Sequence, residues 1–390
     1  MKRFDFKNAD FESLKQALLL SPLSNGMHYV NSIEDFDSLW ELWNDFVFAA
    51  LDTYVPKVNC KRSNRPPWIS NELAKEIHKK KTMWKRIKKS KTPEKVEKFR
   101  KFKQQIKNRL RYERRNYVKN ISEEIHRNSK RFWSYFSFKS KKKLIPEKVT
   151  YNNVVFSDDR GRAEAFNDFF KSIYKDHSDC EVNVDVPILP GVKNFLAHVI
   201  VSVDEIEDIL RSLDTHKAIG HDKLPTIVLK ECAESLAPSI TAIINFSLSH
   251  GFQLSDWKRA NVPPVFKKGK KDLVDNYRPV SLLPVISKVQ ECCMASRLVP
   301  HVKELLYLFQ HGFQKGRSCV TQSLETFYDI GGALDRGIET DIIYLDFAKA
   351  FGSVCPTKLV SKLSTFGIKD PLLSWFHSYL TGRSQRVVVN

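Results

Sequence analysis

The chain has 390 residues, enough for two or three domains with cores of their own. Its hydrophobic content of 42% is ordinary for a globular protein and excludes collagen-like, mucin-like and low-complexity classes. The net charge of +19 is unusual and comes from one region, because residues 57–148 hold 32 Lys or Arg against 8 Asp or Glu, and acids outnumber bases elsewhere. A region of one charge sign indicates contact with a polyanion such as nucleic acid, with an anionic membrane surface as the less favoured alternative.

The cysteine pattern and the apolar runs restrict the compartment. Seven cysteines are scattered along the chain without a CxxC pair or the spacing of a zinc site. The start of the chain lacks the features of a secretory signal, and no apolar span of 18 residues follows. We therefore expect an intracellular protein with reduced thiols and no membrane partner, located in the nucleus, the cytoplasm or both.

Two basic helices are predicted after the short apolar helical runs of residues 1–56. The first begins after Ser70, a typical N-cap, and the second begins at Thr92 and Pro93. Apolar residues of the second helix recur at steps of three, four or seven, which predicts one narrow apolar stripe. The stripe consists of Val96, Phe99, Phe102, Ile106, Leu110, Tyr117, Ile121 and Ile125.

The candidate nucleic-acid-binding residues lie on these two helices. One interpretation is a helical hairpin whose charges are merely solvated. The other is phosphate contact, which we favour because a fourfold excess of basic over acidic residues repels itself unless a polyanion is present. Aromatic residues at 131–138 either stack on bases or pack internally. The candidates are Lys79, Lys80, Lys81, Lys85, Arg86, Arg111, Arg114 and Arg115.

The second half of the chain has an α+β pattern after a linker around residues 141–146. A hairpin is predicted at 148–161, then a helix from Arg162 to Tyr174 and a loop at 187–194. Helices are predicted at 204–213, 225–250, 286–304 and 318–335. Strands are predicted at 260–266, 277–283, 341–346 and 385–389.

The strand predicted at 341–346 carries a candidate catalytic acid. Alternation of side chains places Asp346 and Asp341 on opposite faces, so the two cannot act together without a bulge. Asp346 ends the strand, where sheets of α/β type carry their chemistry. Taken alone, it has an alternative role as the N-cap of a following helix.

Five stretches carry a family resemblance. In chain order, they and the tail from Leu363 resemble the reverse transcriptases of non-LTR, LINE-type retrotransposons, particularly the jockey-like group. The resemblance is strong over residues 200–390 and weaker upstream. The stretches are THKAIGHDKLP (215–225), WKRANVPPVFKKGKK (257–271), NYRPVSLLPVISKVQE (276–291), QHGFQKGRS (310–318) and YLDFAKAFGSV (344–354).

The resemblance implies an α+β fold: the fingers and part of the palm of a right-hand polymerase, preceded by a basic, mostly helical N-terminal region. It implies four regions along the chain. They are the end of a connector after an endonuclease domain (1–56), a basic helical nucleic-acid-binding region (57–148), a hairpin, helix and loop linker (149–202), and the fingers with the first part of the palm (203–390).

The resemblance also implies roles for individual residues. Asp346 would hold two Mg²⁺ ions, assisted by the backbone carbonyl of Phe347, in a two-metal nucleotidyl transfer. Phe351 would be the aromatic gate that excludes a 2′-OH and so selects dNTPs, with a core aromatic as the alternative. Arg278 and Lys267 would grip the triphosphate, with two solvated charges as the alternative. The implied partners are an RNA template, a DNA primer or target, and dNTP; the oligomeric state stays open.

The sequence departs from the family pattern at three positions, and it ends before the last of the family's metal-binding segments. Gly352 stands where the family has Asp, and His221 and Lys223 replace Pro and Gly, which suggests relaxed selection or weakened local order. The family's remaining metal-binding acids lie in an aromatic-x-Asp-Asp turn, and the chain stops at Asn390 before one.

One earlier stretch has the same aromatic-x-Asp-Asp residue pattern as that turn. Phe156-Ser157-Asp158-Asp159 precedes Asp346 instead of following it, and it stands before a helix, where an Asp ordinarily serves as a cap. We therefore expect a fragment that is truncated within the palm and has an incomplete two-metal site, which leaves its enzymatic activity uncertain. The alternative is a non-catalytic nucleic-acid-binding protein that uses the basic helices.

Overall fold

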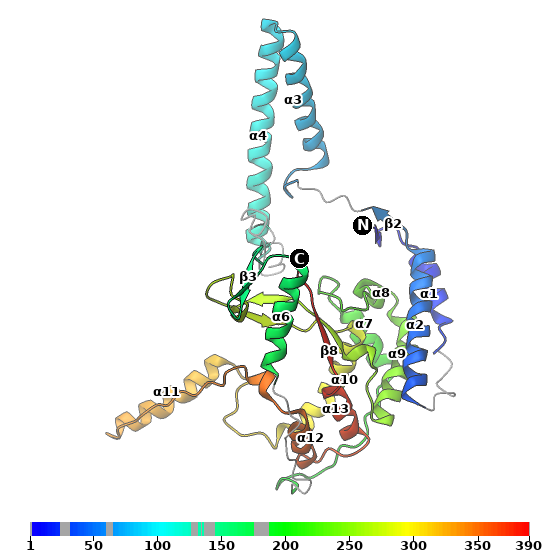
Figure 1. Cartoon of the computed structure of the whole chain (residues 1–390), viewed down its shortest axis with the longest axis vertical. Coiled ribbons are helices and arrows are strands. Elements are labelled where there is room, and N and C mark those ends of the chain that lie inside the picture. Colours follow the sequence, from blue (N-terminus) through cyan, green and yellow to red (C-terminus); the bar gives the residue numbers. More distant parts are fainter. Residues whose placement is uncertain are drawn as a thin grey trace. The chain divides into compact units, whose positions relative to one another are not determined.

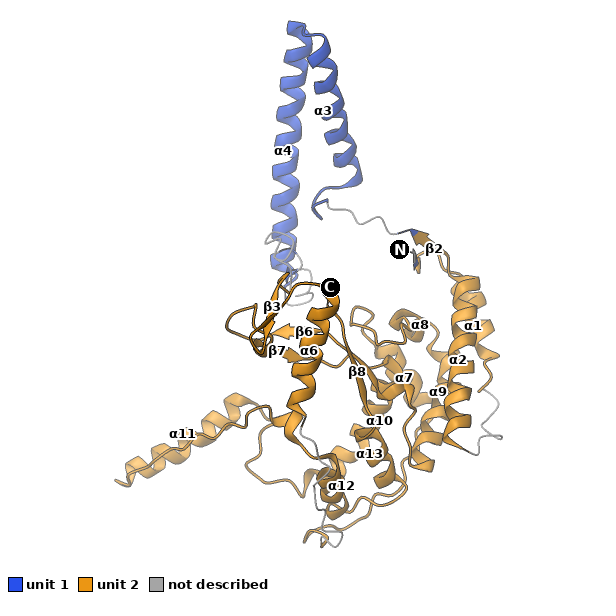
Figure 2. Ribbon diagram, viewed as in Figure 1, with its two compact units in different colours: residues 1–3, 59–144 blue, residues 4–58, 145–390 orange. Residues whose placement is uncertain are grey.

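The computed structural model describes residues 2–23, 32–59, 65–125, 132–133, 135, 145–174 and 187–389. The chain forms two compact units (Figure 2). Unit 1 contains residues 1–3 and 59–144, and unit 2 contains residues 4–58 and 145–390. Most of the linker predicted around 141–146 and most of the aromatic run at 131–138 lie outside the described residues. The division into four regions that the sequence suggested stays a prediction.

Unit 1 is a hairpin of two helices, α3 (Asn71–Lys89) and α4 (Pro93–Glu123) (Figure 1). Both begin where the sequence predicts: the Ser70 hydroxyl accepts a hydrogen bond from the Leu73 amide at 3.1 Å, and Pro93 opens α4. Trp84 stacks on Phe99 between the helices, with ring centroids 5.0 Å apart. Ile106 of the apolar stripe is buried, so the stripe faces the partner helix.

The larger core of unit 2 is helical and surrounds α9. This helix is apolar on nearly every face, and a helix with that pattern is stable only when it is covered on all sides. The prediction of one helix at 225–250 is corrected, because the chain breaks at Cys232 into two. The helices are α1 (Phe11–Leu19), α2 (Ile33–Tyr54), α7 (Val203–Ser212), α8 (Thr226–Glu231), α9 (Ala233–His250), α10 (Val285–Lys303), α12 (Pro356–Thr365) and α13 (Leu372–Leu380).

A second, smaller core in unit 2 forms where α6 (Asp159–Ile173) covers short strands. Phe166 meets Tyr277 edge-on at 4.9 Å in its centre. The strands pair as β3 (Val149–Tyr151) with β4 (Val154–Phe156), β6 (Pro264–Phe266) with β7 (Tyr277–Pro279), both antiparallel, and β5 (Arg259–Val262) with β8 (Ser384–Val387), parallel. The remaining short elements are β1 (Lys2–Phe4), β2 (Lys57–Asn59) and the 3-10 turns η1 (Asp256–Lys258), η2 (Val274–Asn276) and η3 (Ala350–Ser353).

Two predicted strands are shorter than expected because of proline. The strand expected at 260–266 is divided at Pro263, and the strand expected at 277–283 ends at Pro279. Proline has no N–H to donate to a ladder, so it ends or interrupts strand pairing. The helices expected at 204–213, 286–304 and 318–335 are confirmed to within about a residue at each end.

The strand predicted at 341–346 is absent, and this prediction was wrong. The segment has no regular secondary structure and pairs with no strand in the part of the chain that the structure describes. Ile343, Tyr344 and Leu345 are 81%, 85% and 87% exposed. The preceding helix α11 (Cys319–Asp335) has no buried residue and projects from unit 2 (Figure 1). A strand forms only when a neighbour pairs with its backbone, and alternating side chains cannot reveal whether that neighbour is present.

None of the described helices is both long enough and apolar enough to cross a membrane.

Candidate functional site

Asp346 is exposed on the unpaired segment that leads to η3. Its neighbour Phe347 is also on the surface, with 81% of its area exposed. The expected placement of Asp346 at a strand end is therefore wrong, whereas its role as a metal ligand stays a prediction. Asp341 is equally exposed, and no strand fixes the two carboxylates on opposite faces.

The turn after Asp346 is fastened to α6. The Lys349 ammonium lies over the Phe169 ring at 4.9 Å from its centroid. Gly352 packs so closely that a Cβ atom there would overlap the Cγ2 methyl of Ile173. Gly352 is thus explained by close packing, without the weakened local order that its departure from the family pattern suggested. Phe351 lies beside it, 82% exposed, and meets Phe313 edge-on at 6.0 Å.

Arg278 and Lys267 lie on one solvent-facing side of the β6–β7 hairpin. Arg278 is paired with Val265, and the Lys267 amide continues the ladder by donating to the Asn276 carbonyl at 2.8 Å. Residues two apart on a strand share a face, so both cations lie on the Val265 side, opposite the buried Tyr277. The hairpin brings the two together as neighbours, and neither forms an ion pair with an acid that the structure describes.

The eight basic candidates of unit 1 are on the outside of the hairpin. All are exposed except Lys80, which is half-buried. The unit's two ion pairs between α3 and α4 both use Arg109, which contacts Glu76 at 2.5 Å and Glu72 at 3.6 Å. These acids therefore neutralise a cation between the helices, and none of the eight candidates forms an ion pair with an acid that the structure describes. The candidate residues are Lys79, Lys80, Lys81, Lys85, Arg86, Arg111, Arg114 and Arg115.

The described residues do not fit a site for two Mg²⁺ ions. Among them, no group of three or more His, Cys, Asp and Glu side chains is close enough to hold a metal. Asp158 and Asp159 are used elsewhere: Asp158 caps α6 by accepting from the Gly161 amide at 2.7 Å, and Asp159 pairs with Arg162. That hydrogen bond holds the pKa of Asp158 below its ordinary value. The expectation that Asp158 is a helix cap is confirmed.

A cluster of ionisable groups that the sequence did not predict surrounds the loop at 214–225. The His221 ring is 2.8 Å from Asp256, whose other oxygen accepts from the Trp40 indole at 3.1 Å. Asp222 next to it is half-buried, with both carboxylate oxygens shielded from solvent, and burial raises its pKa to about 6, helped by the charge of Asp256. Lys223, where the family has Gly, adopts a left-handed backbone with φ +60°. His221 thus has a definite partner in this chain.

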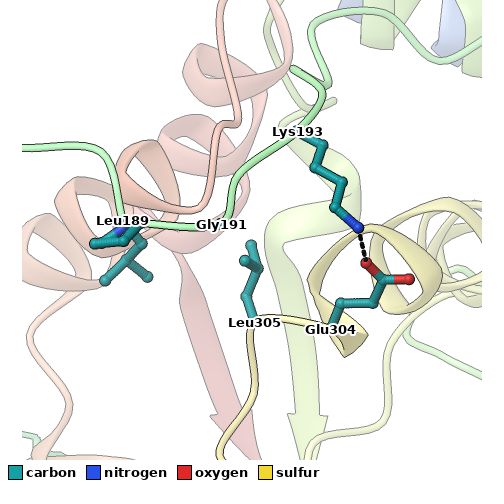
Figure 3. A pocket seen from close by; sticks show the side chains of 6 residues that line it. Leu189, Gly191, Lys193, Glu304 and Leu305 are labelled. Atoms are coloured by element: carbon teal, nitrogen blue, oxygen red, sulfur yellow. Dashed lines mark hydrogen bonds and ion pairs between the residues drawn. The ribbon is translucent and has the colours of Figure 1, made fainter.

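Two cavities of unit 2 differ in character. The smaller, of about 330 Å³, lies between the loop at 187–194 and the end of α10 (Figure 3). Across this cavity the Lys193 ammonium and the Glu304 carboxylate form an ion pair of 3.3 Å, so their charges cancel there. Both side chains are exposed. The larger, of about 820 Å³, includes Phe351 in its wall.

The sequence is similar to known polymerases over its C-terminal part. Residues 266–390 match the family model "Reverse transcriptase (RNA-dependent DNA polymerase)". The chain is 30% identical over 186 residues to the probable RNA-directed DNA polymerase from transposon BS of Drosophila melanogaster, which is 47% of this chain and 20% of that protein. It is 31% identical over 117 residues to the RNA-directed DNA polymerase from mobile element jockey of the same species, which is 29% of this chain and 13% of that protein.

A third relative is described in the same terms. The probable RNA-directed DNA polymerase from transposon X-element of Drosophila melanogaster is 29% identical over 182 residues, which is 46% of this chain and 20% of that protein. The chain therefore spans about a fifth of the length of these relatives or less. Residues 266–390 belong to the reverse transcriptase family, and the chain is related to the reverse transcriptases of jockey-like non-LTR retrotransposons.

Proposed function

We propose that this chain is part of an RNA-directed DNA polymerase of the non-LTR type, comprising the fingers and the first part of the palm of a right-hand polymerase. Its partners are an RNA template, a DNA primer or target, and dNTP. The observation that carries the proposal is the family match of residues 266–390, because this segment contains Lys267, Arg278, Asp346 and Phe351 in the family's order.

The proposed roles follow the chemistry of each group. Arg278 and Lys267 contact the triphosphate, and their common exposed face suits joint contact with one polyanion. Phe351 lies below the sugar of the incoming nucleotide. Asp346 and the Phe347 carbonyl supply oxygen ligands for divalent metal, which the reverse transcriptase family generally uses.

The polypeptide of this length, taken by itself, is expected to bind nucleic acid without completing nucleotide addition. The described residues gather no set of ligands that would hold two metal ions, and Asp346 stands on an exposed, unpaired segment. One carboxylate does not fix two Mg²⁺ ions at the short spacing that in-line displacement needs. We therefore derive no catalytic step through the metals here.

Primer extension tests this proposal. The full chain is mixed with an RNA template carrying a labelled DNA primer, dNTPs and Mg²⁺, and the products are separated by length. We expect binding of the primer–template but no extension above the level of Asp346→Asn. The opposite result is that the unmodified chain extends the primer, while Asp346→Asn binds equally well and does not extend it. That result would contradict the incomplete site and assign polymerase activity to this chain.

A second function is supported by unit 1. Its exposed basic surface favours a non-catalytic nucleic-acid-binding role, which is compatible with the first. The two differ in what they require: only the polymerase depends on Asp346, and only the binding role predicts that neutralising the helices removes most of the affinity.

A further inference from the structure

Helix α11, which projects from unit 2, presents an apolar stripe to solvent (Figure 1). The stripe follows alternating steps of four and three residues, which is the spacing with which two helices pair side by side. Its five large side chains are each 50–71% exposed. In chain order, the stripe consists of Val320, Leu324, Phe327, Gly331, Leu334 and, just past the helix end, Ile338.

The opposite face of α11 is polar. At about 100° per residue, Glu325 and Asp329 lie on the side of the helix opposite Phe327. The Glu325 carboxylate is 3.5 Å from the His311 ring, so the polar side is the one that contacts the preceding loop. The stripe therefore points away from that loop, and α11 has no buried residue in the described structure.

The residues at both ends of α11 fix the helix and with it the stripe. At the beginning, the Thr321 amide donates to the Ser318 hydroxyl at 3.2 Å, and the Thr321 hydroxyl accepts from the Ser318 amide at 2.9 Å. At the end, Gly337 is left-handed with φ +69°, and the Ile338 amide donates to the Ala333 carbonyl at 3.0 Å. The stripe is thus a defined surface with definite limits.

The middle of the stripe complements a second copy of itself when the two helices run antiparallel. If the pair is centred at the level of Asp329, Phe327 of each copy faces Gly331 of the other, two residues on either side of the centre. A Cβ atom placed on Gly331 would meet nothing within 4 Å, so the space before its backbone is open. A large ring opposite a glycine lets two helices approach closely and interlock.

The outer levels of the same antiparallel pair are apolar on both sides. Leu324 of one copy faces Leu334 of the other, and Val320 faces Ile338, since each pair is equally far from the centre. Every level of the stripe therefore meets an apolar residue or the open glycine. No polar group is left in the seam, where it would lose water without gaining a partner.

The charged residues beyond the ends of α11 favour the antiparallel direction. Lys315 and Arg317 precede the helix, and Glu339 and Asp341 follow it. None of the four forms an ion pair in the part of the chain that the structure describes. Antiparallel pairing brings the bases of one copy beside the acids of the other, whereas parallel pairing would bring like charges together.

The area that the pair covers suits a specific dimer. Tyr328 borders the stripe and is 82% exposed, and it lies close to the centre of the antiparallel pair. Aromatic side chains bury about 150–250 Å² each, so Phe327 and Tyr328 of two copies together cover roughly 600–1,000 Å². With the aliphatic levels added, the interface passes the total of about 1,000 Å² that a specific contact needs.

We propose that α11 is a dimerisation helix, which pairs antiparallel with α11 of a second copy of this chain. The partner is a second copy because both the apolar levels and the end charges of the stripe match their own reversed order. The proposal uses residues 315–341 alone, so it does not rest on the proposed polymerase function.

Sedimentation equilibrium of the full chain tests the dimer, after nuclease treatment and in about 0.3 M salt, so that residual nucleic acid does not join copies. We expect a mass of twice 45.2 kDa that falls to 45.2 kDa on dilution. Leu324→Glu with Leu334→Glu places carboxylates in the seam and should raise the dissociation constant by roughly a hundredfold or more. Both leucines are exposed, so the monomer should keep its fold, which circular dichroism checks.

The matched control adds the same charge to α11 away from the stripe. Gln322→Glu with Thr326→Glu changes two exposed positions of the polar side and should alter the dissociation constant less than about threefold. A similar loss of dimer in both double variants would mean that net charge, and not the stripe, governs association.

Disulfide crosslinking tests the direction of the helices. Leu324→Cys and Leu334→Cys are made separately in a Cys319→Ser background and oxidised alone and as a mixture. Only the mixture should give a covalent dimer above background, because the antiparallel pair places these two positions of different copies face to face. Within either variant alone, the two new thiols are about 15 Å apart along the axis, too far for a disulfide.

Three further results would overturn the proposal. A mass of 45.2 kDa at every concentration would leave the stripe to a different protein. A mass that continues to rise beyond two copies would mean unspecific association. Crosslinking of each cysteine variant by itself would mean parallel helices. None of these results depends on primer extension, so this proposal and the proposed function can fail separately.

Discussion

Asp222 is a half-buried carboxylic acid in one of the family-like stretches. Both carboxylate oxygens are buried without a hydrogen-bond partner in the described structure. Burial raises its pKa from an ordinary 3.8 to about 6, and the neighbouring Asp256 adds to this, while His221 opposes it. Relative to the unfolded chain, the folded protein therefore favours the neutral form of this carboxyl group.

The stability of the protein should fall as the pH rises through the interval between the two pKa values of Asp222. Below about pH 4 the carboxyl is protonated in both states, so it costs nothing. Between pH 4 and 6 only the unfolded chain releases the proton, and above pH 6 the full penalty of about 3 kcal/mol applies. Asp222→Asn should thus raise the free energy of unfolding at pH 7.5 by up to this amount and leave it nearly unchanged at pH 4.

Urea denaturation at the two pH values measures this difference. Asp208→Asn, which removes an exposed carboxylate from α7, is the matched control and should show no such pH dependence. An equal effect of Asp222→Asn at both pH values would mean that Asp222 is charged in the folded protein at no cost.

At the scale of elements, Ser247 joins three helices of the larger core. The side chain is fully buried on α9, donates to the Phe252 carbonyl at 2.6 Å, and accepts from Gln290 on α10 and from the Trp375 indole on α13, each at 3.1 Å. A buried donor that loses its acceptor keeps the full cost of leaving water. Ser247 is therefore a polar connection inside an apolar core.

Ser247→Ala should lower the free energy of unfolding by about 2–6 kcal/mol, because it leaves two buried N–H groups without an acceptor at roughly 1–3 kcal/mol each. Ser249→Ala, two residues further on the same helix and exposed, should cost less than about 0.5 kcal/mol. Denaturation midpoints give both values. In a Trp375→Phe background, which removes one of the N–H groups, Ser247→Ala should cost less; an unchanged cost would contradict the shared acceptor.

The elements also show what the sequence could reveal about the fold. Local chemistry predicted the beginnings of α3 and α4, because Ser70 caps the turn that follows it and Pro93 suits the first position of a helix. The segment around Asp346 was mistaken for a strand, because pairing depends on residues far away in the chain. The same limit applies to the larger cavity: Lys171 and Arg383 are brought together only by the fold, and Ile173 explains Gly352 only once α6 and the η3 turn are in contact.

For the whole molecule, the separation of charge is the dominant property. Residues 57–148 hold half of the 64 basic residues but only 8 of the 45 acidic ones. Net charge confined to one unit attracts nucleic acid from a distance and raises the rate of association, without determining which sequence is bound.

Salt titration tests this division on the full chain. Binding of a 30-nucleotide RNA should weaken linearly on a plot of log K against log salt, because each neutralised phosphate releases counterions. Replacing Lys79, Lys80 and Lys81 by Gln should make the slope less steep by about 2, at roughly 0.7 for each lost contact with a single strand. The control with the same loss of charge, Arg211, Lys303 and Lys369 replaced by Gln in unit 2, should alter the slope by less than half as much. Equal changes in both triple variants would mean that net charge alone governs binding, and that the exposed face of α3 has no special part in holding the RNA.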